Sequence, residues 1–363
     1  MTTPPVELSL DDPVSIRAVD SSGMLALAAA LGQQLEDGFA LGRSAERIMA
    51  VEGLRSVVVC GMGGSGVTGD VLRAALSADS AVPIITSKGY ALPSFCGPET
   101  LVLAASYSGN TEETIAAYRE AVSRGCRVVA IASGGQLLAA AGADGVPVVG
   151  IPPNVLAPRA ALGYLTGSAL AVVERAGAIG DQTAEVQASR LTLEDLASRL
   201  GAERPIESNP AKQVAAWLRG GTVLVWGTEG VAEAAALRWK TQLNENAKVP
   251  AFWGVLPELD HNEVEGSSGE GSETQRIVIL RSHTEPPRMR LRVPATVGAM
   301  TAAGLETQEV WCEGSGALAQ TLSLIMMGDF VSVYLAVLRG VDPTPIPILT
   351  GLKERRTSLG TNE

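Results

Sequence analysis

Two short runs rich in Gly, Ser and Thr have the composition of an anion-binding site. GMGGSG occupies residues 61–66 and SYSGNTEET occupies residues 106–114, each between an apolar stretch and a helical pattern. A helix N-terminus presents backbone N–H groups to an anion, and neighbouring hydroxyls add donors without a cation. The sequence therefore predicts that these runs hold a phosphate group. The candidate substrate-binding residues are Gly63, Gly64, Ser65, Ser106, Ser108 and Thr111.

The first run also matches the GxGxxG pattern of dinucleotide-binding proteins. That pattern requires an acidic residue at the end of the second strand, about 20 residues further on, to hold the ribose hydroxyls. Here the second strand ends at Lys88, and the nearest carboxylate, Asp79, precedes that strand. The missing carboxylate disfavours a dehydrogenase. Ordinary helix capping is the remaining alternative for the second run, since Ser, Asn and Thr are common at helix starts.

Histidine and cysteine are scarce, which limits the chemistry. His261 lies in a predicted loop between strands, where an imidazole could move a proton near neutral pH. A structural histidine is the alternative, and His283, in a polar turn, is assigned no role. The four cysteines form no CxxC pair, so a catalytic zinc site is not expected and the thiols fit a reducing cytoplasm.

These residues are positioned by a regular alternation of strand and helix patterns. Strands are predicted at 56–62, 83–87, 100–106, 127–133 and 146–151, with helices at 66–76 and 110–125. The same rhythm restarts with strands at 222–227, 276–281 and 306–312 and a helix at 231–246. Such alternation predicts two tandem doubly wound parallel sheets, of the flavodoxin or Rossmann type. We place the boundary near residue 205, which divides the chain into residues 1–205 and 206–363.

The composition fits a folded protein with large buried cores. Of the 363 residues, 46% are hydrophobic and 18% charged, and the net charge of −11 comes with no long basic run. Nucleic acid is therefore not expected as a partner. The most apolar stretch, residues 321–338, carries Asp329 in its middle, so it is predicted to be a buried helix rather than a membrane span. We expect a cytoplasmic protein that does not bind membranes.

Several longer motifs add a resemblance that covers residues 50–353. SYSGNTEET and GMGGSG resemble the sugar isomerase domain family. The motifs APRAALGY (157–164), RWKTQLNENAK (238–248), LPELDHNE (256–263) and GVDPTP (340–345) are similar to those of bifunctional phosphoglucose/phosphomannose isomerases. The resemblance implies tandem sugar isomerase domains that convert glucose 6-phosphate or mannose 6-phosphate into fructose 6-phosphate through a cis-enediol(ate), without metal or cofactor.

The resemblance also assigns roles to four residues. It implies that Glu245 is the base, that Arg159 stabilises the enediolate, and that His261 and Lys353 take part in ring opening. From position alone, Glu245 would be an ordinary helix-end carboxylate, Arg159 a salt bridge between the two halves, and Lys353 a solvated surface charge. The family places its active site between two subunits and takes the histidine from the neighbouring chain, so a homodimer is implied.

The chain departs from the family pattern near the site. Asp260 replaces a usual Asn, Glu265 follows where an apolar residue is common, Ala157 replaces Gln and Lys88 replaces Arg. These departures leave open a second class of function, a non-catalytic phosphosugar sensor or degenerate homologue linked to mannose metabolism.

Overall fold

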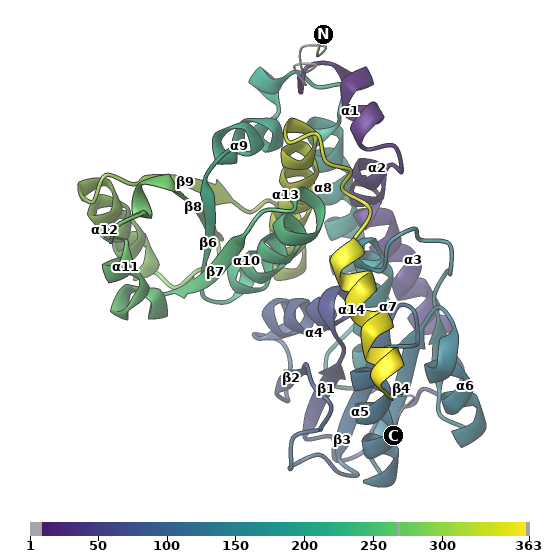
Figure 1. The fold of residues 1–363 in the computed structure, drawn as a ribbon. Coiled ribbons are helices and arrows are strands. Elements are labelled where there is room, and N and C mark those ends of the chain that lie inside the picture. Colours follow the sequence, from purple (N-terminus) through teal and green to yellow (C-terminus); the bar gives the residue numbers. More distant parts are fainter. Residues whose placement is uncertain (1–8, 268, 361–363) are drawn as a thin grey trace.

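The structure, a computed structural model that describes residues 9–267 and 269–360, contains two parallel β-sheets flanked by helices (Figure 1). The first sheet has the strand order β2-β1-β3-β4-β5 and the second β7-β6-β8-β9. The predicted α/β class with two doubly wound sheets is thereby confirmed. The first sheet comprises β1 (Ser56–Cys60), β2 (Ile84–Ser87), β3 (Thr100–Ser106), β4 (Arg127–Ala132) and β5 (Val148–Gly150). The second comprises β6 (Thr222–Thr228), β7 (Ala251–Leu256), β8 (Gln275–Arg281) and β9 (Glu306–Trp311).

Helices cover both faces of each sheet. On the first sheet, α3 (Leu31–Ser44), α4 (Gly63–Leu76) and α7 (Leu162–Arg175) lie on one face, and α5 (Glu112–Ser123) and α6 (Gly135–Asp144) on the other. On the second sheet, α9 (Pro210–Leu218), α10 (Val231–Gln242) and α13 (Ala317–Leu338) lie on the inner face, and α12 (Met289–Ala302) on the outer face. The other helices are α1 (Pro13–Val19), α2 (Met24–Ala29), α8 (Thr183–Leu200), α11 (Glu263–Gly266) and α14 (Pro347–Gly360).

The alternation of side chains along β1 shows why the strands are apolar throughout. Val57 and Val59 face the core shared with α3, α4 and α7, whereas Val58 and Cys60 face α5 and α6. Successive residues of a strand point to opposite faces, so a strand covered on both sides needs apolar residues at every position. All five residues of β1 are buried.

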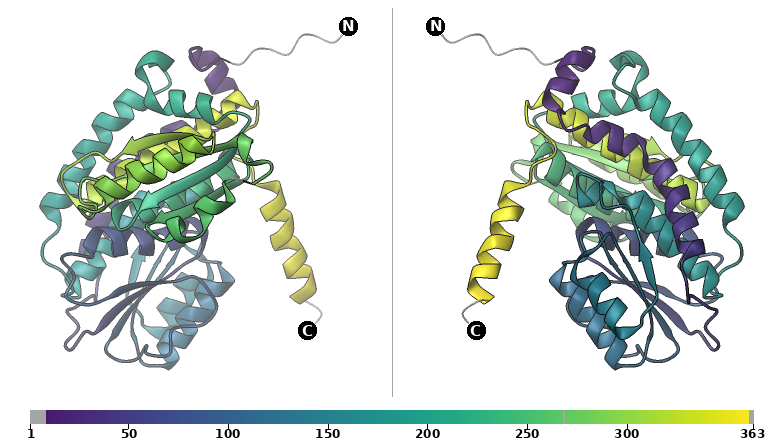
Figure 2. Two further views of the ribbon diagram at one scale, coloured as in Figure 1. Left: turned by 90° about the vertical axis from the view of Figure 1, so that its left-hand side faces the viewer. Right: turned by 90° about the vertical axis from the view of Figure 1, so that its right-hand side faces the viewer.

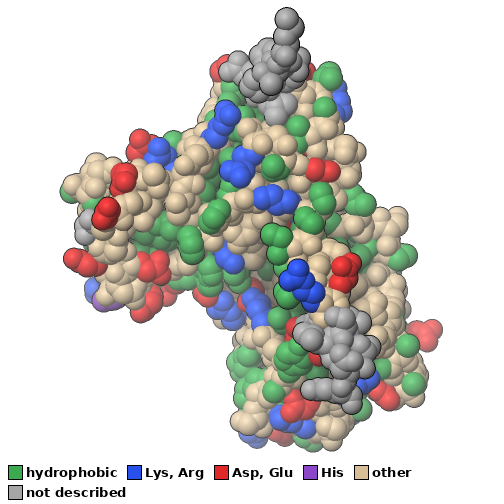
Figure 3. Space-filling model, viewed as in Figure 1, with side chains coloured by type: hydrophobic (Ala, Val, Ile, Leu, Met, Phe, Trp, Pro, Cys, Tyr) green, Lys and Arg blue, Asp and Glu red, His purple; other side chains and the backbone are tan. Residues whose placement is uncertain are grey.

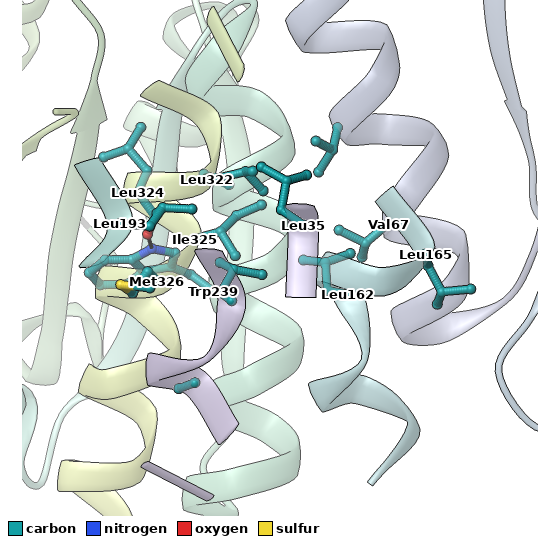
Figure 4. Packing of buried hydrophobic residues seen from close by; sticks show 14 of the residues in the cluster. Leu35, Val67, Leu162, Leu165, Leu193, Trp239, Leu322, Leu324, Ile325 and Met326 are labelled. Atoms are coloured by element: carbon teal, nitrogen blue, oxygen red, sulfur yellow. Dashed lines mark hydrogen bonds between the residues drawn. The ribbon is translucent and has the colours of Figure 1, made fainter. Parts of the chain in front are cut away.

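One continuous hydrophobic core joins the two sheets through their inner helices. Figure 4 shows Val67 of α4 and Leu162 of α7 in the same core as Trp239 of α10 and Ile325 of α13. Helix α4 packs against α7 within its own half and against α10 and α13 of the other half. The start of α4, which carries the first glycine-rich run, is therefore fixed to both halves of the chain.

Helix α13 is the long apolar helix predicted from residues 321–338. Its length and composition would suffice to cross a membrane, but 94% of its most apolar window is buried inside the protein. The prediction of a buried core helix is confirmed. After α13 the chain turns through residues 341–346 and enters α14, which extends away from the body of the molecule (Figure 2).

The edge strand β7 was not among the predicted strands. Its adjacent Phe252 and Trp253 are 56% and 36% exposed, so the strand lacks the regular in–out alternation of a half-buried strand. β7 pairs with β6 alone, at the edge of the second sheet. An edge strand is defined by pairing with its neighbour more than by its own sequence.

A buried ion pair in the joint core gives the first testable prediction. Arg238 donates from Nε and Nη2 to the two carboxylate oxygens of Asp329, at 3.0 Å each, and both side chains are more than nine-tenths buried. Asp329→Asn would leave the guanidinium charge buried without its counter-charge, so we expect the free energy of unfolding to fall by about 3–5 kcal/mol. Urea denaturation measures this loss.

The matched control is Asp195→Asn, which breaks the exposed pair between Asp195 and Arg199. Exposed ion pairs contribute little to stability, so Asp195→Asn should change the free energy of unfolding by less than about 1 kcal/mol. Equal losses in the two variants would contradict a special contribution of the buried Arg238–Asp329 pair to stability.

Candidate active site

The two runs predicted to bind an anion, residues 61–66 and 106–114, meet at the carboxyl-terminal end of the first sheet. Strands β1 and β3 are neighbours, and the chain order reverses between them in the arrangement β2-β1-β3-β4-β5. In open parallel sheets of this kind, ligands bind at the carboxyl ends of the strands at such a switch point. Residues 61–66 follow β1 and residues 106–111 follow β3, so both runs lie at that position.

The first run is packed tightly against its surroundings. Ser65 Oγ accepts a hydrogen bond of 3.1 Å from the backbone N–H of Tyr107, which ties the two runs together. A Cβ on Gly64 would lie only 2.9 Å from Cα of Arg159, so only glycine allows this approach. In the described part of the chain, the N-cap residue Met62 makes no side-chain capping bond to α4. The exposed Gly63 and the first turn of α4 therefore offer backbone donors to a ligand.

The second run is a turn stabilised by its own hydroxyls. Ser106 Oγ accepts from the N–H of Gly109 at 3.2 Å and lies 2.9 Å from Thr111 Oγ1. Gly109 has φ = 66°, and a Cβ there would meet the carbonyl oxygen of Gly134 at 1.8 Å. Within the described residues, Thr111 occupies the N-cap of α5 without a capping bond from its side chain. The Thr111 hydroxyl therefore does not cap α5 in the ordinary way.

Ser108 is the exposed member of the second run. Its Oγ accepts a bond of 3.3 Å from the N–H of Asn110, and its side chain lies at the surface. A serine hydroxyl can accept and donate at once. Ser108 can therefore keep this turn contact while donating to a bound anion.

Arg159 lies beside the first run and is 4% exposed. It belongs to the short helical turn Pro158–Ala160 before α7, and its guanidinium crosses to the C-terminal half. Nε donates to Asn246 Oδ1 at 2.8 Å, and Nη2 donates to the carbonyl oxygens of Pro343 and Thr344 at 2.8 and 2.9 Å. Burial lowers the pKa of Arg159, an effect that Glu245 opposes and Arg238 reinforces. A guanidinium remains protonated despite such a shift.

Glu245 reaches the same point from the second half of the chain. Its carboxylate Oε2 lies 3.6 Å from Nη1 of Arg159, and its side chain is 24% exposed. The predicted helix 231–246 ends early at Gln242 and continues as a π-helical turn, Leu243–Ala247. Single π turns occur often at functional sites, because the wider turn redirects side chains. Here the turn directs Glu245 towards Arg159 while its neighbour Asn246 is fully buried.

Lys248 also belongs to this group of contacts, although its sequence position did not mark it as a site residue. Lys248 has a left-handed backbone (φ = 57°), and its ammonium donates to the carbonyl oxygens of Glu245 and Pro343. Burial, and then the neighbouring charge of Arg159, lower its pKa. Lys248 thus fastens the π turn to the 341–346 turn. The only sequence signal for it was its place at the end of the LNENAK motif.

His261 and Lys353 occupy different positions from the Arg159–Glu245 pair. His261 is exposed at the end of the turn Glu258–His261, which leads into α11 at the outer side of the second sheet (Figure 1). In the described chain no hydrogen bond or ion pair is seen between His261 and Arg159, Glu245 or either of the two runs. Lys353 is exposed on α14. A single chain therefore brings together the anion-binding runs, Arg159 and Glu245, but not His261.

Asp260 does not present its charge to the anion-binding runs. Its carboxylate accepts from Nη1 of Arg292 and from Oγ1 of Thr296, both on α12 and both at 2.9 Å. The negative charge that replaces the family's Asn is thus compensated locally. Glu265, by contrast, is exposed on α11.

The surface charge agrees with an anion site between the two halves. Figure 3 shows Lys and Arg side chains along the middle of one face, where the two halves meet, and Asp and Glu side chains gathered at the end that carries α11. Among residues 9–267 and 269–360, no group of three or more His, Cys, Asp or Glu side chains has the arrangement of a metal site.

Comparisons with known proteins identify the family of this chain. Residues 207–355 match the model of the bacterial phospho-glucose isomerase C-terminal SIS domain. The chain is 35% identical over 327 residues to a bifunctional phosphoglucose/phosphomannose isomerase of Caldicellulosiruptor bescii, covering 90% of this chain and 96% of that one. It is 34% identical to the protein of the same name from Aquifex aeolicus, covering 83% and 90%.

Among solved structures, a hypothetical protein of Thermus thermophilus superposes with a TM-score of 0.71 at 18% identity, covering 95% of this chain and 94% of that one. The fold with two parallel sheets and the SIS domain match over residues 207–355 define a protein of the sugar isomerase (SIS) class. More narrowly, the chain belongs to the family of bifunctional phosphoglucose/phosphomannose isomerases, as its motifs predicted. It is therefore an enzyme of the aldose–ketose isomerase class.

Proposed function

We propose that this enzyme converts both glucose 6-phosphate and mannose 6-phosphate into fructose 6-phosphate, in the cytoplasm and without a metal ion. The observation that carries the proposal is the pairing of Glu245 with Arg159 at 3.6 Å, beside two runs suited to phosphate. The names of the Caldicellulosiruptor and Aquifex relatives supply the two substrates.

The proposed reaction moves one proton between two carbons. Glu245 removes the proton at C2 of the open-chain aldose and returns it to C1, through a cis-enediol(ate). The outward nitrogen of Arg159, Nη1, stabilises the negative charge that develops on the oxygens at C1 and C2. The phosphate is held by backbone donors of residues 63–65 and hydroxyls of residues 106–111. Because these groups contact only the phosphate end, they do not distinguish epimers at C2.

Ring opening is assigned to His261 and Lys353. Since His261 of one chain lies away from Arg159 and Glu245 of the same chain, the proposal requires that a second copy supplies it. The active enzyme is then a homodimer with its sites between subunits. Size-exclusion chromatography with light scattering tests this, and a fully active monomer would contradict it.

The direct test is a coupled assay of purified protein in excess EDTA. Fructose 6-phosphate should form from each hexose 6-phosphate at the same rate with and without the chelator. Loss of turnover in EDTA, with recovery on adding a divalent metal, would contradict metal independence. Phosphosugar binding without turnover would instead indicate a sensor.

Asp260 gives a further prediction about substrate affinity. The Asp260 carboxylate is paired with Arg292 and accepts a hydrogen bond from Thr296. Asp260→Asn should therefore change KM for either hexose 6-phosphate by less than about threefold. Steady-state kinetics of the variant measure this. A decrease of about tenfold or more in KM would show that the carboxylate repels the substrate phosphate.

A further inference from the structure

Asn246 is a buried amide next to the proposed base, and both of its polar groups are in use. The residue is fully buried in the π turn, one position after Glu245. Its Oδ1 accepts from Nε of Arg159 at 2.8 Å, and its Nδ2 donates to Oγ of Ser332 at 2.9 Å. The Ser332 hydroxyl in turn donates to the backbone carbonyl of Asp329 at 2.7 Å. This chain of bonds determines which way the amide faces.

The hydrogen bonds of Arg159 involve Nε and Nη2, so Nη1 is the nitrogen available to interact with a substrate. Asn246 occupies Nε, and the carbonyls of Pro343 and Thr344 occupy Nη2. In the described chain, Nη1 has no hydrogen bond and faces the Glu245 carboxylate. Since a guanidinium is planar, fixing Nε and Nη2 also fixes the direction of Nη1. Asn246 therefore takes part in setting where the charge of Arg159 points.

Helix α13 supports both ends of Arg159. Arg238 donates to the backbone carbonyl of Arg159 at 2.7 Å while it is paired with Asp329 on α13. Asn246 connects the guanidinium to Ser332, one turn further along α13. Arg159, Asn246 and Asp329 also line a cavity of about 10 Å³, which is about the space that one water molecule needs.

We propose that Asn246 is a positioning residue that orients Nη1 of Arg159 towards the Glu245 carboxylate and the developing enediolate. The inference rests on the proposed function, in which Arg159 stabilises that charge. A donor that moves by about 1 Å loses much of its effect on a transition state, whereas ground-state binding of the phosphate is unaffected. The proposal therefore predicts a loss in kcat with little change in KM.

The first experiment compares variants at position 246 with a matched control. Asn246→Ala and the nearly isosteric Asn246→Leu should each lower kcat by about 10- to 100-fold and change KM by less than about threefold. Ser332→Ala, which removes only the hydroxyl that holds the amide, should lower kcat by about threefold. Asn209→Ala removes another fully buried Asn, which caps α9, and should leave kcat of the folded enzyme within about twofold.

The second experiment is a double-mutant cycle with Arg159→Lys. If Asn246 acts through Arg159, adding Asn246→Ala to Arg159→Lys should lower kcat by less than about threefold beyond Arg159→Lys alone. Additive losses, or a loss confined to thermal stability as in Asn209→Ala, would overturn the proposal. Unlike a merely structural role, a positioning role predicts this dependence on Arg159.

Binding of an enediolate mimic separates this inference from the proposed function. The probe is an aldonohydroxamate phosphate, whose planar head resembles the enediolate, and its affinity is measured by calorimetry. If the wild-type chain turns over no hexose 6-phosphate, the proposed function fails. The inference then stands if Asn246→Ala and Arg159→Lys each weaken binding of the probe about tenfold or more without additivity. It fails if binding is unchanged or absent.

Discussion

Replacing Glu245 by Gln should lower kcat for both hexose 6-phosphates by about 10²–10⁴-fold, because the amide cannot accept the C2 proton. The fold should be retained, since the carboxylate is partly exposed and its ion pair with Arg159 is 3.6 Å long. The measurement is steady-state kinetics, with circular dichroism to confirm folding.

A matched control for this variant lies on α10. Glu233 is also a partly exposed carboxylate that pairs with an arginine of the other half, Arg73, at 2.8 Å. Glu233→Gln should leave kcat within about twofold, because the pair does not adjoin the anion-binding runs. Full activity of Glu245→Gln, or an equal loss in Glu233→Gln, would show that Glu245 is not the base.

Arg159→Lys should affect activity and stability together. Lysine keeps the charge but cannot reproduce the planar set of donors that reaches Asn246, Pro343 and Thr344. We expect kcat to fall by about 10²–10³-fold, as when a transition-state donor is lost. Unpaired carbonyls in the joint between the halves should lower the free energy of unfolding by about 1–3 kcal/mol.

Kinetics and urea denaturation of the same preparation measure both effects. Arg73→Lys is the control, because Arg73 also pairs across the two halves but is 41% exposed. The free energy of unfolding of Arg73→Lys should fall by less than about 1 kcal/mol, and its kcat should be unchanged. A stable, fully active Arg159→Lys would show that Arg159 neither takes part in catalysis nor stabilises the contact between the two halves.

Much of the fold followed from the sequence because its signals are local. The strand β1, the turn at residues 61–66 and the start of α4 are specified by neighbouring residues, namely an apolar run, glycines and a helical pattern. The same is true of α13, whose apolar run is long and continuous. The edge strand β7 was missed because its own residues show no strand pattern, and its conformation depends on pairing with β6.

The connections within the site could not be predicted in the same way. Arg159 meets Asn246 and the 343–344 carbonyls, which are 87, 184 and 185 residues away along the chain. Nothing in local spacing indicates that an Asn, a Glu and two backbone carbonyls will surround one guanidinium. The two interpretations of Arg159, a tie between the halves and a catalytic cation, also turn out to be compatible in the structure. The boundary near residue 205 and the roles of Glu245, Arg159, His261 and Lys353 are proposals.

The central claim is that a proton moves between C1 and C2 on Glu245, and solvent deuterium tests it most directly. Glucose 6-phosphate and mannose 6-phosphate are each incubated with the enzyme and EDTA in D₂O, and the products are examined by NMR. We predict fructose 6-phosphate carrying deuterium at C1, aldose carrying deuterium at C2, and neither label with Glu245→Gln. Conversion without any label even at equilibrium, or unchanged labelling by Glu245→Gln, would contradict the account.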